Sequence, residues 1–182
     1  YELGDNGIFR KLINHLEGEE RFSVIGIENL APELITPIAC MTNKSPSAAD
    51  INDIKYGLIE ARKLGKQDVG QGVIVAEGMV LSQEDRMGTD AMIKSLPRLG
   101  SNKKRRGLLV KALKPGQERR VDLPTVGPDT VELAADFGLR GIALEAGHTL
   151  ILDRERFVKN ANQRGVFVIG IDGSTTYDSS LS

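Results

Sequence analysis

The stretch "TLILDRERFVKNANQRGVFVIGI", residues 149 to 171, decides the fold class. Its apolar start, residues 149–152, predicts a strand, and Asp153 is placed to cap a helix that Gly165 ends. The apolar run 166–171 then predicts a buried strand. A strand, a helix and a second strand in this order are typical of a βαβ crossover between parallel strands of one sheet.

The rest of the chain continues this alternation of helices and strands. Helices are expected at residues 5–18, 47–65, 84–96 and 128–138, and strands at 21–27, 69–76, 79–83 and 107–113, with two further strands within 141–152 separated by a tight turn at Gly147 and His148. The two strands around Glu77 and Gly78 form a hairpin, and the proline-containing segment 28–46 predicts a loop. This pattern indicates an α/β fold, a mixed sheet flanked by helices in a single compact domain. We expect that domain to cover residues 1–172, with a disordered tail at 173–182.

Composition excludes several classes of protein. The net charge of the 182 residues is −1, so no overall field attracts nucleic acid, and the 4% aromatic content without Trp argues against base stacking. Cys40 is the only cysteine, which rules out an internal disulfide and fits a reducing compartment. The longest apolar runs are too short to span a bilayer. We therefore expect a cytoplasmic protein with no nucleic-acid partner.

A charged but proline-rich segment, "KALKPGQERRVDLPTVGPDT" at residues 111–130, is the first candidate site. Lys111 lies near the carboxyl end of a predicted buried strand, and Lys114 follows it. Ligands of open α/β sheets gather at that edge, and lysines there meet phosphates as mobile point charges.

The second half of this segment adds a fixed carboxylate. Pro124 favours an extended backbone before it, which would hold Asp122 rigidly and direct Arg120 to the same side. The helix that begins at Pro128 offers free amides to an anion. Cations, a carboxylate and a helix N-terminus suit a phosphorylated ligand with magnesium, which takes one or two carboxylates plus substrate phosphates. The alternative is that these are ordinary solvated surface charges.

Two shorter motifs have both a structural and a functional interpretation. In "MGTDAM", residues 87–92, Thr89 or Asp90 can cap a helix, or both can present a hydroxyl and a carboxylate to a ligand or metal. In "GQG", residues 70–72, the glycines either form a tight strand entrance or let the backbone approach a ligand closely.

Several long motifs resemble one family in the same order along the chain. They are "GDNGIFRKLI" (4–13), "ARKLGKQDVGQGVIV" (61–75), "GTDAM" (88–92), "KPGQERRVDLPTVGPDTV" (114–131), "GIALEAGHTLILDRE" (141–155) and "FVIGID" (167–172). Together they are similar to the C-terminal half of UDP-2,3-diacylglucosamine pyrophosphatases of the LpxI type. The resemblance covers nearly the whole chain except the tail.

The resemblance implies a hydrolase of lipid A biosynthesis in Gram-negative bacteria. Such an enzyme cleaves UDP-2,3-diacylglucosamine to UMP and 2,3-diacylglucosamine 1-phosphate (lipid X), with Mg²⁺ or Mn²⁺ as cofactor. It places the essential carboxylate of the "DLP" motif at Asp122, with Asp90 as a second candidate metal ligand. The expected substrate-binding residues are Gln71, Thr89, Asp90, Lys111, Lys114, Gln117 and Arg120.

This chain departs from the family's pattern at two points. Met87 stands where the family usually has a glutamate before "GTDAM", and the chain, which lacks a starting Met, begins where the family's N-terminal domain should end. We therefore expect a C-terminal catalytic-type domain that is active only with the missing domain. The alternative is a non-catalytic domain for phospho-ligand binding or oligomerisation. A homodimer and peripheral contact with the inner membrane, through the basic run 103–106 on anionic lipid, are both compatible with these features.

Overall fold

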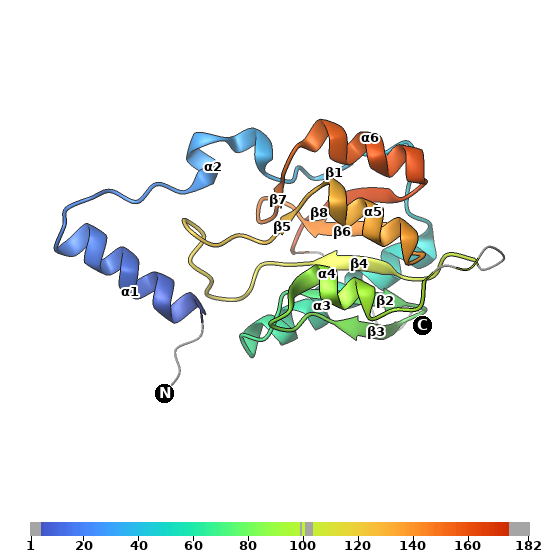
Figure 1. Ribbon diagram of the computed structural model, residues 1–182, viewed down its shortest axis with the longest axis horizontal. Coiled ribbons are helices and arrows are strands. Elements are labelled where there is room, and N and C mark those ends of the chain that lie inside the picture. The colour runs from blue at the N-terminus through green and yellow to red at the C-terminus, as the bar shows by residue number, and fades with distance from the viewer. Residues whose placement is uncertain (1–4, 99, 101–103, 175–182) are drawn as a thin grey trace.

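A six-stranded mixed sheet forms the centre of the molecule in a computed structural model, which describes residues 5–98, 100 and 104–174. Its strands are β1 (Ala39–Cys40), β2 (Gly72–Ala76), β3 (Met79–Gln83), β4 (Leu108–Lys111), β6 (Gly141–Glu145) and β8 (Phe167–Ile171). Their order across the sheet is β1-β8-β6-β4-β2-β3. The central strands β4, β6 and β8 are parallel, whereas β2 lies antiparallel to both β4 and β3. The carboxyl ends of β4 and β6 therefore meet the amino end of β2 at one edge (Figure 1).

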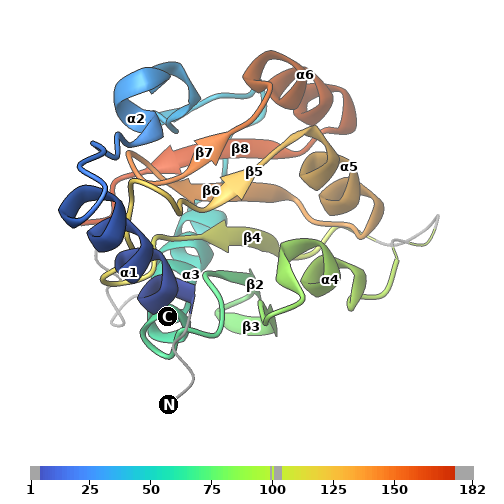
Figure 2. The ribbon, with the colours of Figure 1, turned by 60° about the vertical axis from the view of Figure 1, so that its left-hand side comes forward.

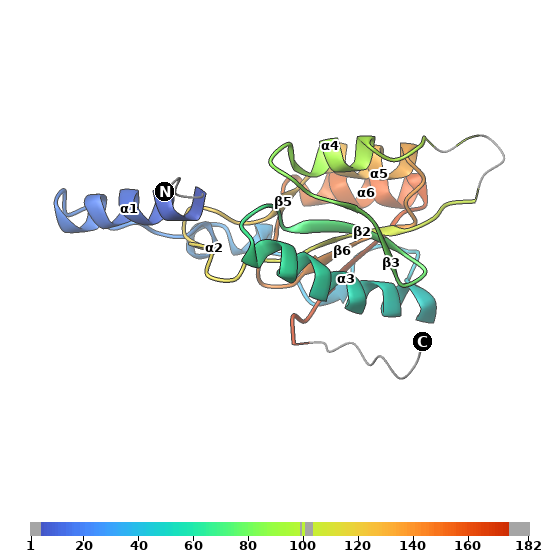
Figure 3. The same ribbon diagram turned by 90° about the horizontal axis from the view of Figure 1, so that it is seen from below.

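Helices cover both faces of the sheet, so the fold has three layers. Figure 3 shows α3 (Ala48–Lys66) on one face, and α4 (Gly88–Lys94), α5 (Pro128–Asp136) and α6 (Arg154–Arg164) on the other. Each interface has its own apolar cluster, built around Leu58 and Val110 on the α3 side and around Leu109 and Phe157 on the other. The predicted α/β class with a mixed sheet and flanking helices is confirmed.

The start of α3 confirms the helix expected from Ser47. Its side chain accepts a hydrogen bond from the Asp50 amide, and the Asp50 carboxylate accepts one from the Ser47 amide. This reciprocal pair satisfies two amides that a helix N-terminus otherwise leaves free.

Replacing Ser47 with alanine removes half of this capping pair. We expect the free energy of unfolding to fall by about 1 kcal/mol. Urea denaturation followed by circular dichroism measures this, with Ser45→Ala, an exposed serine just before the helix, as the control. An equal effect of both substitutions would contradict the capping role.

The predicted crossover over residues 149–171 is partly wrong. Helix α6 and strand β8 form as expected, and the Asp153 side chain accepts a hydrogen bond from the Arg156 amide. The strand before the helix, β7 (Leu150–Ile151), does not join the main sheet; it pairs in parallel with β5 (Thr125–Val126) in a second, two-stranded sheet. The neighbour of β8 is instead β6, so the crossover runs from β6 through β7 and α6.

The N-terminal segment differs most from expectation. Helix α1 (Asp5–Gly18) is confirmed, but residues 21–26 form no strand, and α2 (Ile27–Leu30) and the 3-10 helix η1 (Pro32–Leu34) follow them. Phe22 and Ile25 are exposed there. An apolar alternating run is stable as a strand only when a neighbouring strand and a core cover it, and here neither does.

Helix α1 lies beside the loop that joins β4 to β5 (Figure 2). The Arg10 guanidinium donates a hydrogen bond of 2.8 Å to the Gly116 carbonyl, and Glu17 pairs with Arg120 at 2.8 Å. Polar contacts thus connect this helix to the segment that carries the candidate residues. Of the expected tail, only Gly173 and Ser174 belong to the described residues.

Candidate active site

The candidate residues gather where β4 ends beside the start of β2. The Ala112 amide donates to the Gln71 carbonyl at 3.0 Å, and Gly72 lies opposite Lys111 in the antiparallel ladder. The predicted position of Lys111 at the carboxyl end of a buried strand is confirmed. Because β2 runs in the opposite direction, its first residues meet the last residues of β4, and this brings Gln71 to the site.

Lys111 belongs to a buried polar cluster with Thr89 and Glu84. Its ammonium Nζ lies 2.6 Å from Thr89 Oγ1 and 3.5 Å from Glu84 Oε1. The Thr89 hydroxyl in turn donates to Glu84 Oε1 at 2.5 Å. Lys111 is 3% exposed and Glu84 is 6% exposed, so both charges are removed from water and depend on each other and on Thr89.

The glycines of the "GQG" motif make room for this cluster. A Cβ atom at Gly70 would lie 2.4 Å from the Glu84 carbonyl oxygen, and one at Gly72 would lie 3.2 Å from Glu84 Oε2. The Gln71 amide between them donates to Glu84 Oε2 at 2.9 Å. The group that approaches these glycines closely is therefore Glu84. The structural interpretation of the motif, a tight strand entrance, fits better than the interpretation in which a ligand lies against the glycines.

Two opposing influences act on the pKa of Lys111: burial and the nearby carboxylates. Burial is the largest influence and lowers the pKa of Lys111 below its ordinary value. The nearby negative charges of Glu84, Asp90 and Asp122 act in the other direction and raise that pKa. The structure thus brings both predicted carboxylates, Asp90 on α4 and Asp122 on the loop, into the field of one buried ammonium.

Gln117 holds Asp122 in place. Its Nε2 donates to Asp122 Oδ2 at 2.6 Å, while its Oε1 accepts from the Lys114 amide at 3.1 Å. The Asp122 amide donates to the Glu118 carbonyl, so residues 118–122 form a turn and not the extended strand that we expected. The reason is local: a helical-type turn satisfies backbone groups that no strand lies near enough to pair.

Arg120 pairs with two acidic residues other than Asp122. The Arg120 guanidinium pairs with Glu118 at 2.9 Å and with Glu17 of α1 at 2.8 Å, and these hydrogen bonds raise its pKa. The extended backbone on which we placed Arg120 and Asp122 on the same side is absent, and the two side chains have different partners. Lys114 Nζ pairs with Asp68 at 3.0 Å. The substrate-binding roles of Lys114 and Arg120 stay predictions.

Asp122 and the start of α5 are separated by β5, which carries the chain into the second sheet. At the helix start the Gly127 amide donates to Thr130 Oγ1 at 3.3 Å, so this amide already has a partner.

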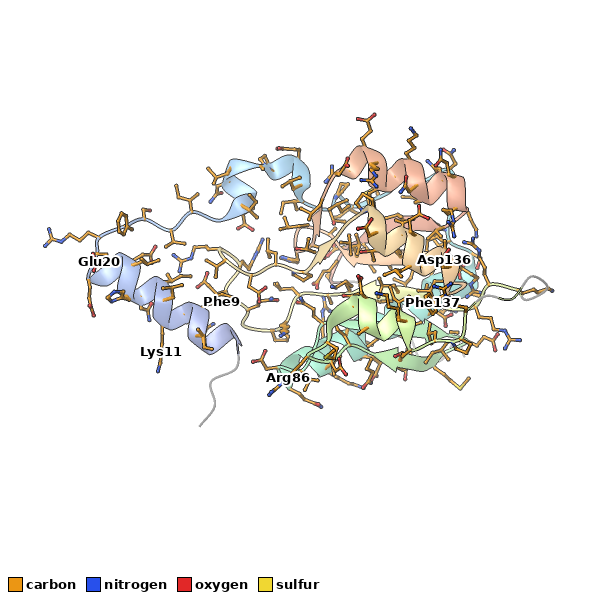
Figure 4. All side chains as sticks on the ribbon, viewed as in Figure 1. Phe9, Lys11, Glu20, Arg86, Asp136 and Phe137 are labelled. Atoms are coloured by element: carbon orange, nitrogen blue, oxygen red, sulfur yellow. The ribbon has the colours of Figure 1, made fainter. Side chains whose placement is uncertain are left out.

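Figure 4 shows Arg86, two residues after Glu84, at the end of the molecule that faces α1, whereas Asp136 and Phe137 lie at the opposite end. The basic run 103–106 enters β4 at its amino end; Lys104 and Arg106 are exposed there, and Lys103 lies outside the described residues.

Glu84 is the residue that sequence analysis missed. A glutamate directly after an exposed strand is ordinarily a solvated charge, and nothing in its neighbours indicates burial. Its burial follows from two glycines more than ten residues earlier in the chain. The only related signal in the sequence is Met87, which stands where the resembled family usually has a glutamate. In the structure it is Glu84 that supplies a carboxylate to Thr89.

A divalent metal is compatible with the carboxylates present. Within residues 5–98, 100 and 104–174, no group of three or more His, Cys, Asp or Glu side chains is arranged to hold a metal ion. Asp90 and Asp122, however, lie near the same ammonium, and magnesium commonly takes one or two carboxylates with water and substrate phosphates as its other ligands. Magnesium binding by Asp90 and Asp122 stays a prediction.

A search of the described helices for membrane spans found none that is both long and apolar enough. Comparison with known proteins gives more direct information. The LpxI C-terminal domain family matches residues 37–169. The UDP-2,3-diacylglucosamine pyrophosphatase LpxI of Caulobacter vibrioides is 40% identical over 174 residues, which cover 93% of this chain and 62% of that protein. The chain thus spans less than two thirds of the length of this relative.

Proposed function

The chain belongs to the LpxI family, and on that premise we propose that it carries out the metal-dependent hydrolysis of the pyrophosphate of UDP-2,3-diacylglucosamine. The products are UMP and 2,3-diacylglucosamine 1-phosphate (lipid X), a step of lipid A biosynthesis in Gram-negative bacteria. Because the chain spans 62% of its relative, we infer that residues 1–172 act as the C-terminal part of a larger active unit.

The observation that supports this proposal best is the buried ammonium of Lys111 at the carboxyl edge of the sheet. It lies between Thr89 and Glu84 and within the field of Asp90 and Asp122. Such a site suits a negatively charged ligand that binds together with a divalent metal: the ammonium attracts the ligand and the carboxylates attract the metal. Hydrolysis of a diphosphate depends mainly on positioning and on neutralising charge, which such a site supplies.

Each residue of the site has a specific role in this proposal. Lys111 binds a phosphate oxygen and offsets its charge, and Gln71 offers its side-chain amide to the same ligand, while Thr89 orients the Lys111 ammonium by accepting one of its N–H groups. Asp122, oriented by Gln117, accepts a proton from the attacking water or aligns it with the phosphorus. Asp122 and Asp90 would hold Mg²⁺ or Mn²⁺, which when bound stabilises charge on the phosphoryl oxygens and lowers the pKa of water. Lys114 exchanges its partner Asp68 for a phosphate when substrate binds.

The substrate carries two acyl chains, so we propose a cytoplasmic protein that contacts the inner membrane peripherally. The exposed basic residues Lys104 and Arg106 support such contact, because anionic lipid attracts clustered positive charge. A homodimer is part of the same proposal, with exposed apolar side chains of α1 such as Ile8 and Leu12 as candidate contacts.

An assay for UMP release tests the function directly. The chain is incubated with UDP-2,3-diacylglucosamine and Mg²⁺ or Mn²⁺, alone and together with the part of the Caulobacter relative that it does not span. Metal-dependent release of UMP in either mixture supports the proposal. Substrate binding without turnover in both mixtures would favour a non-catalytic phospho-ligand-binding domain, and no binding in either would favour an oligomerisation domain.

A further inference from the structure

Glu84 is a buried acid that the proposed reaction does not yet use. It directly follows β3 and is 6% exposed, and its partners lie on three separate elements. We propose that Glu84 is a positioning residue of this active site, which fixes the Thr89 hydroxyl and the Lys111 ammonium in the orientation that a phosphate ligand requires. This inference rests on the proposed function, and its test separates the two.

Both oxygens of the Glu84 carboxylate are occupied. Oε1 accepts from the Thr89 hydroxyl of α4 and lies 3.5 Å from Lys111 Nζ at the end of β4. Oε2 accepts from the Gln71 amide at the start of β2. One carboxylate therefore connects the three elements that supply the predicted phosphate-binding side chains. Charge-assisted hydrogen bonds of this kind are short and directional.

Gly70 allows the backbone of residue 84 to approach closely. A Cβ at Gly70 would meet Glu84 backbone atoms at 2.4 Å and 2.8 Å, so only glycine permits the approach. Burying an ionised carboxylate costs several kcal/mol unless its partners compensate, and an apolar residue would fill such a position at lower cost. Buried carboxylates that carry this free-energy cost are common at functional sites that need their negative charge.

The hydrogen bonds determine how Lys111 presents its protons. Since the Thr89 proton is donated to Glu84, a lone pair of the Thr89 oxygen faces Lys111 and accepts one of its N–H groups. Glu84 attracts a second N–H. An ammonium has three donors, and within the described part of the chain this arrangement leaves the third for a phosphate oxygen. Without Glu84, Thr89 can turn its proton elsewhere and Lys111 can rotate.

Glu84 also supports the positive charge on Lys111. Burial lowers the pKa of Lys111, and the charges that face it and raise that pKa belong to Glu84, Asp90 and Asp122. Glu84 is the only one of these three with an ion-pair contact to Lys111 among the described residues. A purely structural role, in which Glu84 only ties the hairpin to the sheet, predicts a loss of stability and no loss of kcat in a folded Glu84→Gln variant.

The main test replaces Glu84 with glutamine, which keeps the size and removes the charge. We expect kcat/KM to fall roughly 10–100-fold, mostly through kcat, and the alkaline limb of the pH–rate profile to move to lower pH. The sign follows because losing the Glu84 charge lowers the pKa of Lys111 further, so the ammonium is lost at a lower pH.

Glu145→Gln is the matched control. Glu145 is 5% exposed at the end of β6, where it holds Arg62 and the Leu113 amide, and we expect it to change stability but not the alkaline limb.

A second measurement does not depend on turnover. The Lys111 side chain is followed by ¹³Cε NMR in the full chain, with its signal assigned by Lys111→Arg. The titration point is expected to fall in the order wild type, Glu84→Asp, Glu84→Gln, and the aspartate variant alone suffices if the glutamine variant does not fold. An unchanged titration point would overturn the inference. If the titration shifts but no mixture hydrolyses the substrate, the proposed function fails, and only the coupling between Glu84 and the charge of Lys111 stands.

Discussion

Replacing Asp122 with asparagine is expected to abolish most of the hydrolysis and leave the fold intact. Asparagine has the same size as aspartate, and its Oδ1 can still accept the hydrogen bond from Gln117 Nε2. What is lost is the negative charge to which we assign the orientation of water and the binding of the metal. Removing a group of this kind costs on the order of 10²–10⁴ in kcat.

The measurement is UMP release by the mixture that turns substrate over, at saturating substrate and metal. Circular dichroism and urea denaturation verify that the variant is folded. Asp136→Asn is the control: this exposed aspartate on α5 pairs with Arg164 at the far end of the molecule, and its loss is expected to leave kcat nearly unchanged (Figure 4). Full activity of Asp122→Asn would remove Asp122 from the mechanism.

Replacing Lys111 with methionine is expected to have the largest effect on stability. Methionine fills much the same volume, but it leaves the Glu84 carboxylate buried without its cation. Breaking a buried ion pair on one side typically costs about 3–5 kcal/mol, because the remaining charge is uncompensated. We expect the free energy of unfolding of this chain to fall by that amount.

Urea denaturation of a matched series measures this effect. The double variant Lys111→Met/Glu84→Gln removes both charges and is expected to recover part of the loss. Lys114→Met breaks the pair with the partly exposed Asp68 and should cost no more than about 1 kcal/mol. If Lys111→Met were no more destabilising than Lys114→Met, water or another group would have to support the charge of Glu84, and the cluster would not be the closed unit described above.

Local signals in the sequence predicted much of the fold correctly. The caps at Ser47 and Asp153 and the hairpin turn at Glu77 and Gly78 depend on residues a few positions apart, so pattern and propensity are sufficient to find them. The failures involve partners distant in the chain. The segment 21–27 has the composition of a strand but lies beside no other strand, and β7 has the pattern of a sheet strand but pairs with β5.

The same distinction applies to the site. Lys111 was predictable because its strand is strongly apolar and the polar edge of such strands is a known place for ligands. Glu84 was not, because its burial requires two glycines of a different strand. The partners of Arg120 were not predictable because Pro124 suggested an extended backbone, whereas residues 118–122 form a turn and Arg120 pairs with Glu17 of a distant helix.

The attachment of α1 has a mechanical consequence. The helix contacts the loop at Gly116 through Arg10 and at Arg120 through Glu17, and these two points flank Gln117, whose side chain binds Asp122, two residues beyond Arg120. A rotation of α1 relative to the sheet would therefore displace this loop and, through Gln117, Asp122. A protein or domain that bound the exposed side of α1 would therefore be coupled mechanically to the carboxylate that we propose for catalysis.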